Sequence, residues 1–186
     1  MTKIEKEVGS RKSEVGTFEY LWLKFQKMKK YLRISYCIII CLTIGFFSGK
    51  LTQSSITTWY PTLVKPIFNP PNWIFAPVWT LLYIGMGIAS GLIWNEIENK
   101  QKEVKIALQY FILQLGLNAL WSYLFFGLNN LLLSLIEIVL LLLVIIECYK
   151  LFKPINATAA KLFIPYIAWV SFATLLTLSI FYLNNF

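Results

Sequence analysis

Aromatic side chains and prolines dominate residues 59–79, which read WYPTLVKPIFNPPNWIFAPVW. The stretch holds three Trp, two Phe and five Pro, and its one charged residue is Lys65. Indole and phenol rings stack favourably on other flat rings, so residues of these types can bind flat apolar molecules. Proline biases the residue before it toward extended or turn geometry. We therefore expect a stiff aromatic lid, followed by a helix that begins at Asn72–Trp73.

Side chains for acid–base or metal chemistry are scarce. The chain has no His and no Asp, which excludes a His-ligated haem, a zinc site built on His and a Ser-His-Asp triad. Cys37, Cys41 and Cys148 lie within or beside apolar runs. They are expected to be small apolar filler, not disulfide partners or metal ligands. No cofactor and no metal is expected to be required.

Long apolar runs must position the aromatic rings. The 186 residues are 58% hydrophobic and 14% charged, which is too little charge for a soluble domain of this length. A helix that spans the bilayer needs about 20 apolar residues. Five runs approach or exceed that length, over residues 34–52, 74–95, 105–126, 130–150 and 160–183. These runs predict an all-α membrane protein, a five-transmembrane-helix bundle over residues 33–186.

A basic N-terminal tail is predicted over residues 1–32, on the cytoplasmic side. Its segment FEYLWLKFQKMKKYL fits a short amphipathic helix on the membrane surface, or a solvated linker. Fifteen of the 17 Lys and Arg fall on this side of the predicted spans, against Lys50 and Lys65 on the other. This bias predicts the N-terminus inside and the C-terminus outside. It also explains the net charge of +8 without nucleic acid, with contact to anionic lipid secondary. A bacterial inner membrane is expected, and the mitochondrial outer membrane is the alternative.

Aromatic and amide side chains recur at helical spacing in three of the runs. Each set shares one helix face: Trp79, Tyr83, Ser90 and Trp94; Gln114, Asn118, Trp121 and Phe125; Pro165, Trp169, Ala173 and Thr177. An interfacial aromatic belt explains single residues near the ends of spans. It does not explain amides beside Trp on one stripe, because polar side chains in spans face inward. The stripes therefore indicate a bundle interior or a cavity.

Two further features of the runs leave alternatives open. Gly87 and Gly91 form a GxxxG pair, which brings helices close either within one chain or between two chains. Glu137 is an acid inside the fourth run, where charge is expensive. It is expected either to act in function or to be a hydrogen-bonded packing residue, with Asn118 or Ser134 as partner.

Three segments of the chain resemble the translocator protein family, also called TspO/MBR, tryptophan-rich sensory proteins or peripheral benzodiazepine receptors. They are WYPTLVKPIFNPPNWIFAPVWTLLYIGMGIASGLIW, QLGLNALWSYLFFGL and PYIAWVSFATLLTLSIFYLN, and the resemblance covers about residues 34–184. It implies a five-helix bundle, often a homodimer, with a pocket closed by the loop after the first helix. It also implies binding of porphyrins such as protoporphyrin IX and of isoquinoline carboxamide or benzodiazepine drugs. Animal members also bind cholesterol, but Leu178 and Tyr182 depart from their cholesterol motif.

The resemblance implies ligand-binding roles for eight residues. They are Trp59 and Tyr60 in the lid, Trp79 and Tyr83 in PVWTLLY, Asn118 and Trp121 in NALW, and Trp169 and Ala173 in PYIAWVSFA. The predicted function is the binding of porphyrins and related hydrophobic molecules by a sensor, a binding protein or a protein that assists transport, with the propionates of a porphyrin near Lys65. The alternative is a light- and oxygen-dependent enzyme that degrades porphyrin, for which Trp79 and Trp169 are the catalytic candidates.

Overall fold

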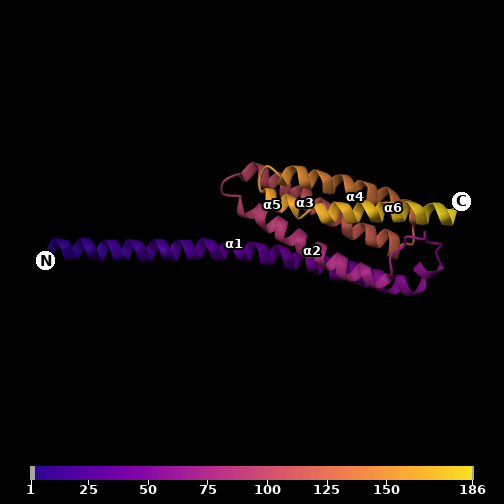
Figure 1. Cartoon of the computed structure of the whole chain (residues 1–186), viewed down its shortest axis with the longest axis horizontal. Helices are drawn as coiled ribbons and strands as arrows, with labels where there is room; N and C mark the ends of the chain where they lie inside the picture. The colour runs from indigo at the N-terminus through magenta and orange to yellow at the C-terminus, as the bar shows by residue number, and fades with distance from the viewer. Residues whose placement is uncertain (1–2, 186) are drawn as a thin grey trace.

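The computed structural model describes the backbone from Lys3 to Asn185 and the side chains from Glu19 to Asn185. Its helices are α1 (Lys3–Thr58), α2 (Asn72–Asn95), α3 (Gln101–Ser122), α4 (Leu131–Phe152), α5 (Ala157–Lys161) and α6 (Ile164–Asn185), with a 3-10 helix η1 (Tyr60–Thr62) and a π-helix η2 (Tyr123–Gly127). The second half of α1 packs with α2, α3, α4 and α6 in a bundle, while the first half projects beyond it (Figure 1). The described part of the chain contains no strand.

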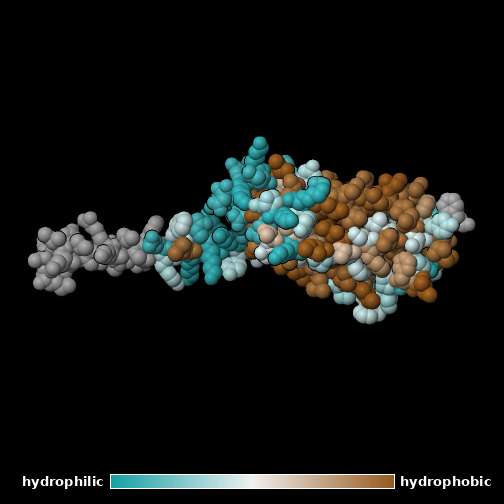
Figure 2. Space-filling view, turned by 45° about the horizontal axis from the view of Figure 1, so that its top comes forward, coloured by the Kyte–Doolittle hydropathy of each residue, from teal (hydrophilic) through white to brown (hydrophobic). Residues whose placement is uncertain are grey.

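Five helices of the bundle are long and apolar enough to cross a membrane: α1, α2, α3, α4 and α6. This confirms the predicted fold class. The start of α2 at Asn72 is also confirmed. The helix does not extend to the N-terminal side of Pro71, because a proline disfavours helical geometry in the residue before it. The outer surface of the bundle is mainly apolar (Figure 2), as contact with lipid chains requires.

Helix α1 continues through the predicted tail. Residues 19–32 form neither a separate surface helix nor a linker, because α1 runs unbroken from Lys3 to Thr58. No Gly or Pro lies between Thr17 and Ile44, so nothing in this segment interrupts the helix. The domain boundary at residue 32 stays a prediction, and the side chains before Glu19 lie outside the described residues.

The basic links gather at one end of the bundle. Arg33 of α1 pairs with Glu98 of the α2–α3 link at 3.3 Å. Lys100 Nζ donates to the backbone oxygen of Pro154, in the α4–α5 link, at 2.7 Å. These contacts place the α2–α3 link, the α4–α5 link and Arg33 of α1 on the same side, opposite the residues that join α1 to α2. We call the two sides the basic end and the lid end.

Two glycines bring α1 and α2 into close contact toward the basic end. A Cβ built on Gly87 would overlap the backbone of Ile38, and one built on Gly91 would overlap Ile34. The GxxxG pair therefore joins two helices of the same chain, which settles the alternative left open by the sequence. Nearer the lid end, a Cβ on Gly45 of α1 would overlap the ring of Tyr83.

A π-helix ends the third span. In η2 the backbone N–H of Leu128 donates to the oxygen of Tyr123 at 2.8 Å, five residues back. The wider turn allows the consecutive rings of Phe125 and Phe126 to be buried together, at 2% and 9% exposure. Such single π turns often occur at functional sites. Asn129 then takes a positive φ of 53°, and the Asn130 side chain caps α4.

Candidate functional site

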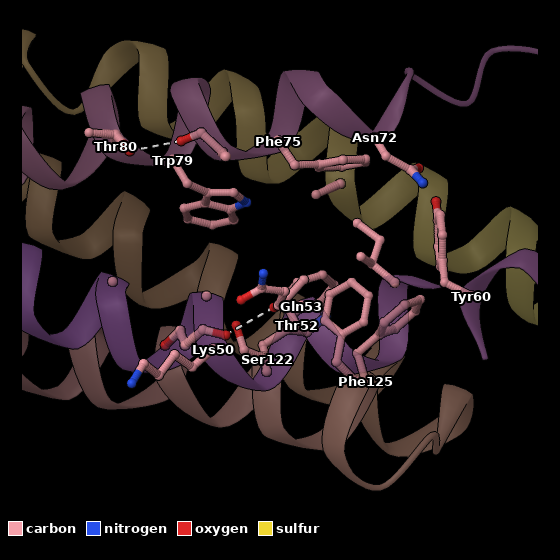
Figure 3. Close-up of a pocket in the computed structure, with 18 of the residues that line it drawn as sticks. Lys50, Thr52, Gln53, Tyr60, Asn72, Phe75, Trp79, Thr80, Ser122 and Phe125 are labelled. Carbon is pink, nitrogen blue, oxygen red and sulfur yellow. Dashed lines mark hydrogen bonds between the residues drawn. The ribbon is translucent and has the colours of Figure 1, made fainter. Parts of the chain in front are cut away.

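The bundle encloses a cavity of about 770 Å³ at its lid end. Walls come from α1, α2, α3, η2 and α6, and η1 contributes Tyr60. In Figure 3, Phe75 and Trp79 lie on one side of the space and Gln53 and Phe125 on the other, with Tyr60 at the lid end. A cavity of this size falls within the range of small-molecule sites, about 300–1,000 Å³.

Hydrogen bonds join the two ends of the lid, residues 59–71, to each other and attach its middle to α6. Tyr60 Oη donates to Asn69 Oδ1 at 2.6 Å, which ties the start of the lid to its end. The Asn184 side chain, near the end of α6, accepts from Val64 N at 3.0 Å and donates to Val64 O at 2.9 Å. Burial raises the pKa of Tyr60 to about 12, so its phenol stays neutral.

Aromatic rings from different helices form the walls. Trp121 stacks on Phe125 with centroids 5.2 Å apart and an interplanar angle of 22°. The rings of Trp169 on α6 and Phe75 on α2 pack in a T-shaped arrangement, with their centroids 6.1 Å apart. These contacts hold the four rings in fixed orientations, and all four residues line the cavity.

A buried chain of hydrogen bonds lies behind the cavity, on the side of the basic end. Tyr83 Oη donates to Asn118 Oδ1 at 2.5 Å, and Asn118 Nδ2 donates to Tyr166 Oη at 2.9 Å. Tyr166 Oη in turn donates to Gln114 Oε1 at 2.9 Å. The chain connects α2, α3 and α6, and it satisfies polar groups that are buried between these helices.

The structure brings six of the eight predicted site residues to the cavity wall: Tyr60, Trp79, Tyr83, Trp121, Trp169 and Ala173. The other two stand behind that wall. The rings of Trp59 and Phe125 pack in a T-shaped arrangement with centroids 5.5 Å apart, and Asn118 is hydrogen-bonded to Tyr83. The predicted contacts of all eight with a ligand stay a prediction.

Several lining residues were missed by sequence reasoning, among them Phe75, Phe126 and Lys50. Phe126 is brought to the wall by the π-helix, which no sequence pattern indicated. Lys50 had a visible signal, because it is a single cation at the end of an apolar run.

Lys65, where the propionates were expected, does not line the cavity. Its Nζ donates to Leu63 O at 3.2 Å and lies 4.8 Å from the centre of the Tyr60 ring. These two contacts hold it within the lid.

Glu137 lacks the hydrogen-bond partner that the sequence led us to expect. It is 4% exposed, and within the described part of the chain neither carboxyl oxygen has a partner. Asn118 is occupied by two tyrosines, and Ser134 donates to the backbone oxygen of Asn130 at 2.5 Å. The predicted pairing is therefore wrong, because both candidate partners are bound elsewhere.

Comparison with known proteins gives matches over the whole bundle. The model of the TspO/MBR family matches residues 37–183. The chain is 40% identical to a tryptophan-rich protein TspO of Chlorobaculum tepidum over 160 residues, 84% of this chain and 98% of that protein. It is 36% identical to the translocator protein of Bos taurus over 132 residues, 71% and 78% of the two chains. A tryptophan-rich sensory protein of Cereibacter sphaeroides is 32% identical over 126 residues, 68% and 77% of the two chains.

Proposed function

Because the chain belongs to the TspO/MBR family and is an integral membrane protein, we propose that it binds porphyrins such as protoporphyrin IX in the lid-end cavity. The observation that supports this proposal most directly is the set of indoles on the wall, from α2, α3 and α6. A tetrapyrrole is flat and mostly apolar, so it suits walls built from ring faces. Burial of about 300 Å² of apolar ligand surface contributes about 7 kcal/mol before ordering costs, which predicts micromolar affinity.

The fixed lid supports the same proposal. Because Tyr60, Asn69 and Asn184 already hold the lid, little chain entropy remains to be lost when a ligand enters. Binding to a site of this kind serves a sensor, or a carrier that assists transport of the porphyrin.

Titration of the purified protein with protoporphyrin IX in the dark tests the proposal. Saturable quenching of tryptophan fluorescence at micromolar ligand is the expected result. Trp169→Leu removes one ring from the wall and should weaken binding about two- to tenfold, the usual worth of an aromatic pair. Trp94→Leu is the matched control, because Trp94 lies near the basic end of α2 and contacts Tyr36 and Arg33 instead of the cavity. Equal loss in both variants, or quenching that never saturates, contradicts the proposal.

Light separates binding from the enzymatic alternative. Trp79 and Trp169 both line the cavity, so an indole-dependent photo-oxidation of a bound porphyrin would have both of its candidates beside the ligand. The same titration under illumination decides between the functions. New absorbing products that disappear in Trp79→Phe and Trp169→Phe would indicate an enzyme, and unchanged absorption with retained quenching would indicate a binding protein.

We also propose that the basic end faces the inside of a bacterial inner membrane, because 15 of the 17 Lys and Arg lie either in the chain up to Arg33 or in and beside the α2–α3 and α4–α5 links. A cysteine placed at Asn185 should then react with an impermeant maleimide added outside whole cells. Labelling that occurs only after the membrane is opened would show that the orientation is the opposite one. A homodimer in that membrane stays a prediction from the family.

A further inference from the structure

The cavity holds one charged side chain. Among the described residues that line it, Lys50 is the single charged group, and neither Asp nor Glu takes part. The two ion pairs of the described side chains, Arg33–Glu98 and Glu147–Lys150, lie elsewhere. The Lys50 ammonium instead lies 4.9 Å from the centre of the Phe46 ring, on its own helix. The cavity therefore presents a cation that no acidic side chain of the described residues neutralises.

Two further donors of the wall are also without an acceptor. The indole nitrogens of Trp121 and Trp169 are buried, and neither finds a hydrogen-bond partner within the described part of the chain. Because both nitrogens have almost no accessible surface, a molecule in the cavity does not reach them as the rings stand, and Lys50 is the group that makes the cavity complementary to an anion.

The exposed part of the lining shows where the cavity opens. Every lining residue that is exposed belongs to α1 or α2: Phe46, Gly49, Lys50 and Gln53 on α1, and Asn72, Trp73, Ala76 and Thr80 on α2. The lining residues of α3, η2 and α6 are all buried or half-buried. The cavity therefore opens sideways, through a slot between the two helices.

Lys50 lies on the edge of this slot, away from the lid. In Figure 3, Lys50 on α1 and Thr80 on α2 lie at the end of the cavity opposite Tyr60. A flat ligand that enters through the slot places its apolar body among the rings. An acidic substituent then remains at the opening, within reach of a side chain that has four rotatable bonds.

We propose that Lys50 binds a carboxylate of the ligand at the slot between α1 and α2, so that the cavity selects flat molecules with an acidic group over their neutral analogues. This inference rests on the proposed function and adds a class of ligand to it. It also moves the anchoring cation from the lid, where Lys65 is engaged with Leu63 and Tyr60, to the first span.

The test compares protoporphyrin IX with its dimethyl ester, which has the same ring and no acid. Binding is measured by tryptophan quenching in neutral detergent, for the wild type, Lys50→Gln and Lys50→Arg, with Lys65→Gln as the matched control. The wild type and Lys65→Gln should prefer the diacid about fivefold, as a partly exposed ion pair allows. Lys50→Gln should lose this preference by weakening the diacid alone, and Lys50→Arg should retain it. The preference should also shrink as salt is raised from low to high ionic strength.

Two outcomes overturn the inference separately from the proposed function. Equal affinity of the wild type for diacid and ester shows that no charge is recognised. A preference that survives in Lys50→Gln and is lost in Lys65→Gln assigns recognition to the lid. Failure of both compounds to bind the wild type saturably removes the proposed function, and this inference with it.

Discussion

The contact between α1 and α2 differs sharply between its two halves. Toward the basic end, Gly87 and Gly91 let the backbone of α2 meet that of α1 at Ile38 and Ile34, and no space remains between the helices. Toward the lid end, the same two helices line a cavity of about 770 Å³ and leave it open at the side. Two glycines lie at the close contact in one half, and aromatic rings line the open space in the other.

This difference shows how a membrane bundle combines stability with a binding site. Lipid chains are as apolar as the side chains of the spans, so close packing and polar contacts, more than apolar burial, hold the helices together. The basic half supplies that packing. The lid half can therefore contain a cavity. The aromatic rings that line this cavity are held by contacts with one another and with the lid. Substitutions in the two halves should therefore affect different properties.

The largest expected effect is that of Gly87→Leu. The added side chain meets the backbone of Ile38, which cannot move aside as a flexible side chain does. We expect a loss of stability of about 3 kcal/mol, at the upper end of overpacking effects, seen as a lower midpoint of thermal unfolding in detergent. Gly116→Leu on α3 is the control, because nothing lies within 4 Å of its Cβ position. Similar midpoints for the two variants would show that the α1–α2 contact is not close in the membrane protein.

A substitution in the other half should act on binding and leave folding intact. Ala173 of α6 lines the cavity, and Ala173→Phe places a ring in the space a ligand would take. We expect protoporphyrin affinity to fall about tenfold or more, a loss of at least about 1.4 kcal/mol, with little change in the unfolding midpoint. Ala168→Phe is the control on the same helix, since Ala168 is exposed and does not line the cavity. Full binding by Ala173→Phe would place the ligand elsewhere.

The smallest expected effect lies at the boundary between the halves. Asn118→Leu removes the amide that links Tyr83 to Tyr166 and should lower stability by about 1 kcal/mol, as for other hydrogen bonds between membrane helices. Unfolding midpoints of Asn118→Leu, Tyr83→Phe and the double variant measure the coupling. The double variant should lose less than the two single variants together, because Tyr83→Phe removes the hydroxyl that Asn118→Leu leaves unpaired. Strict additivity would mean that the short Tyr83–Asn118 bond contributes no coupling.

The sequence by itself determined the five spans, the all-helical class and the inward face of three helices. Run length and the spacing of residues such as Trp79, Asn118 and Trp169 report these directly, because the bilayer sets helix length and makes exposed polar groups costly. The start of α2 could also be predicted from the sequence, because Pro70 and Pro71 disfavour helical geometry in the residues before them.

Only the tertiary structure decided which of these residues meet. Whether Gly87 packs within one chain, which cation reaches the cavity and which partners Asn118 takes depend on the rotation and distance of one helix relative to another. Periodicity gives the face that a residue occupies but not the residue opposite, and each of these questions concerns a pair far apart in the chain. For the same reason the π-helix that brings Phe126 to the wall had no signal in the sequence: its position follows from packing against α1 and the lid.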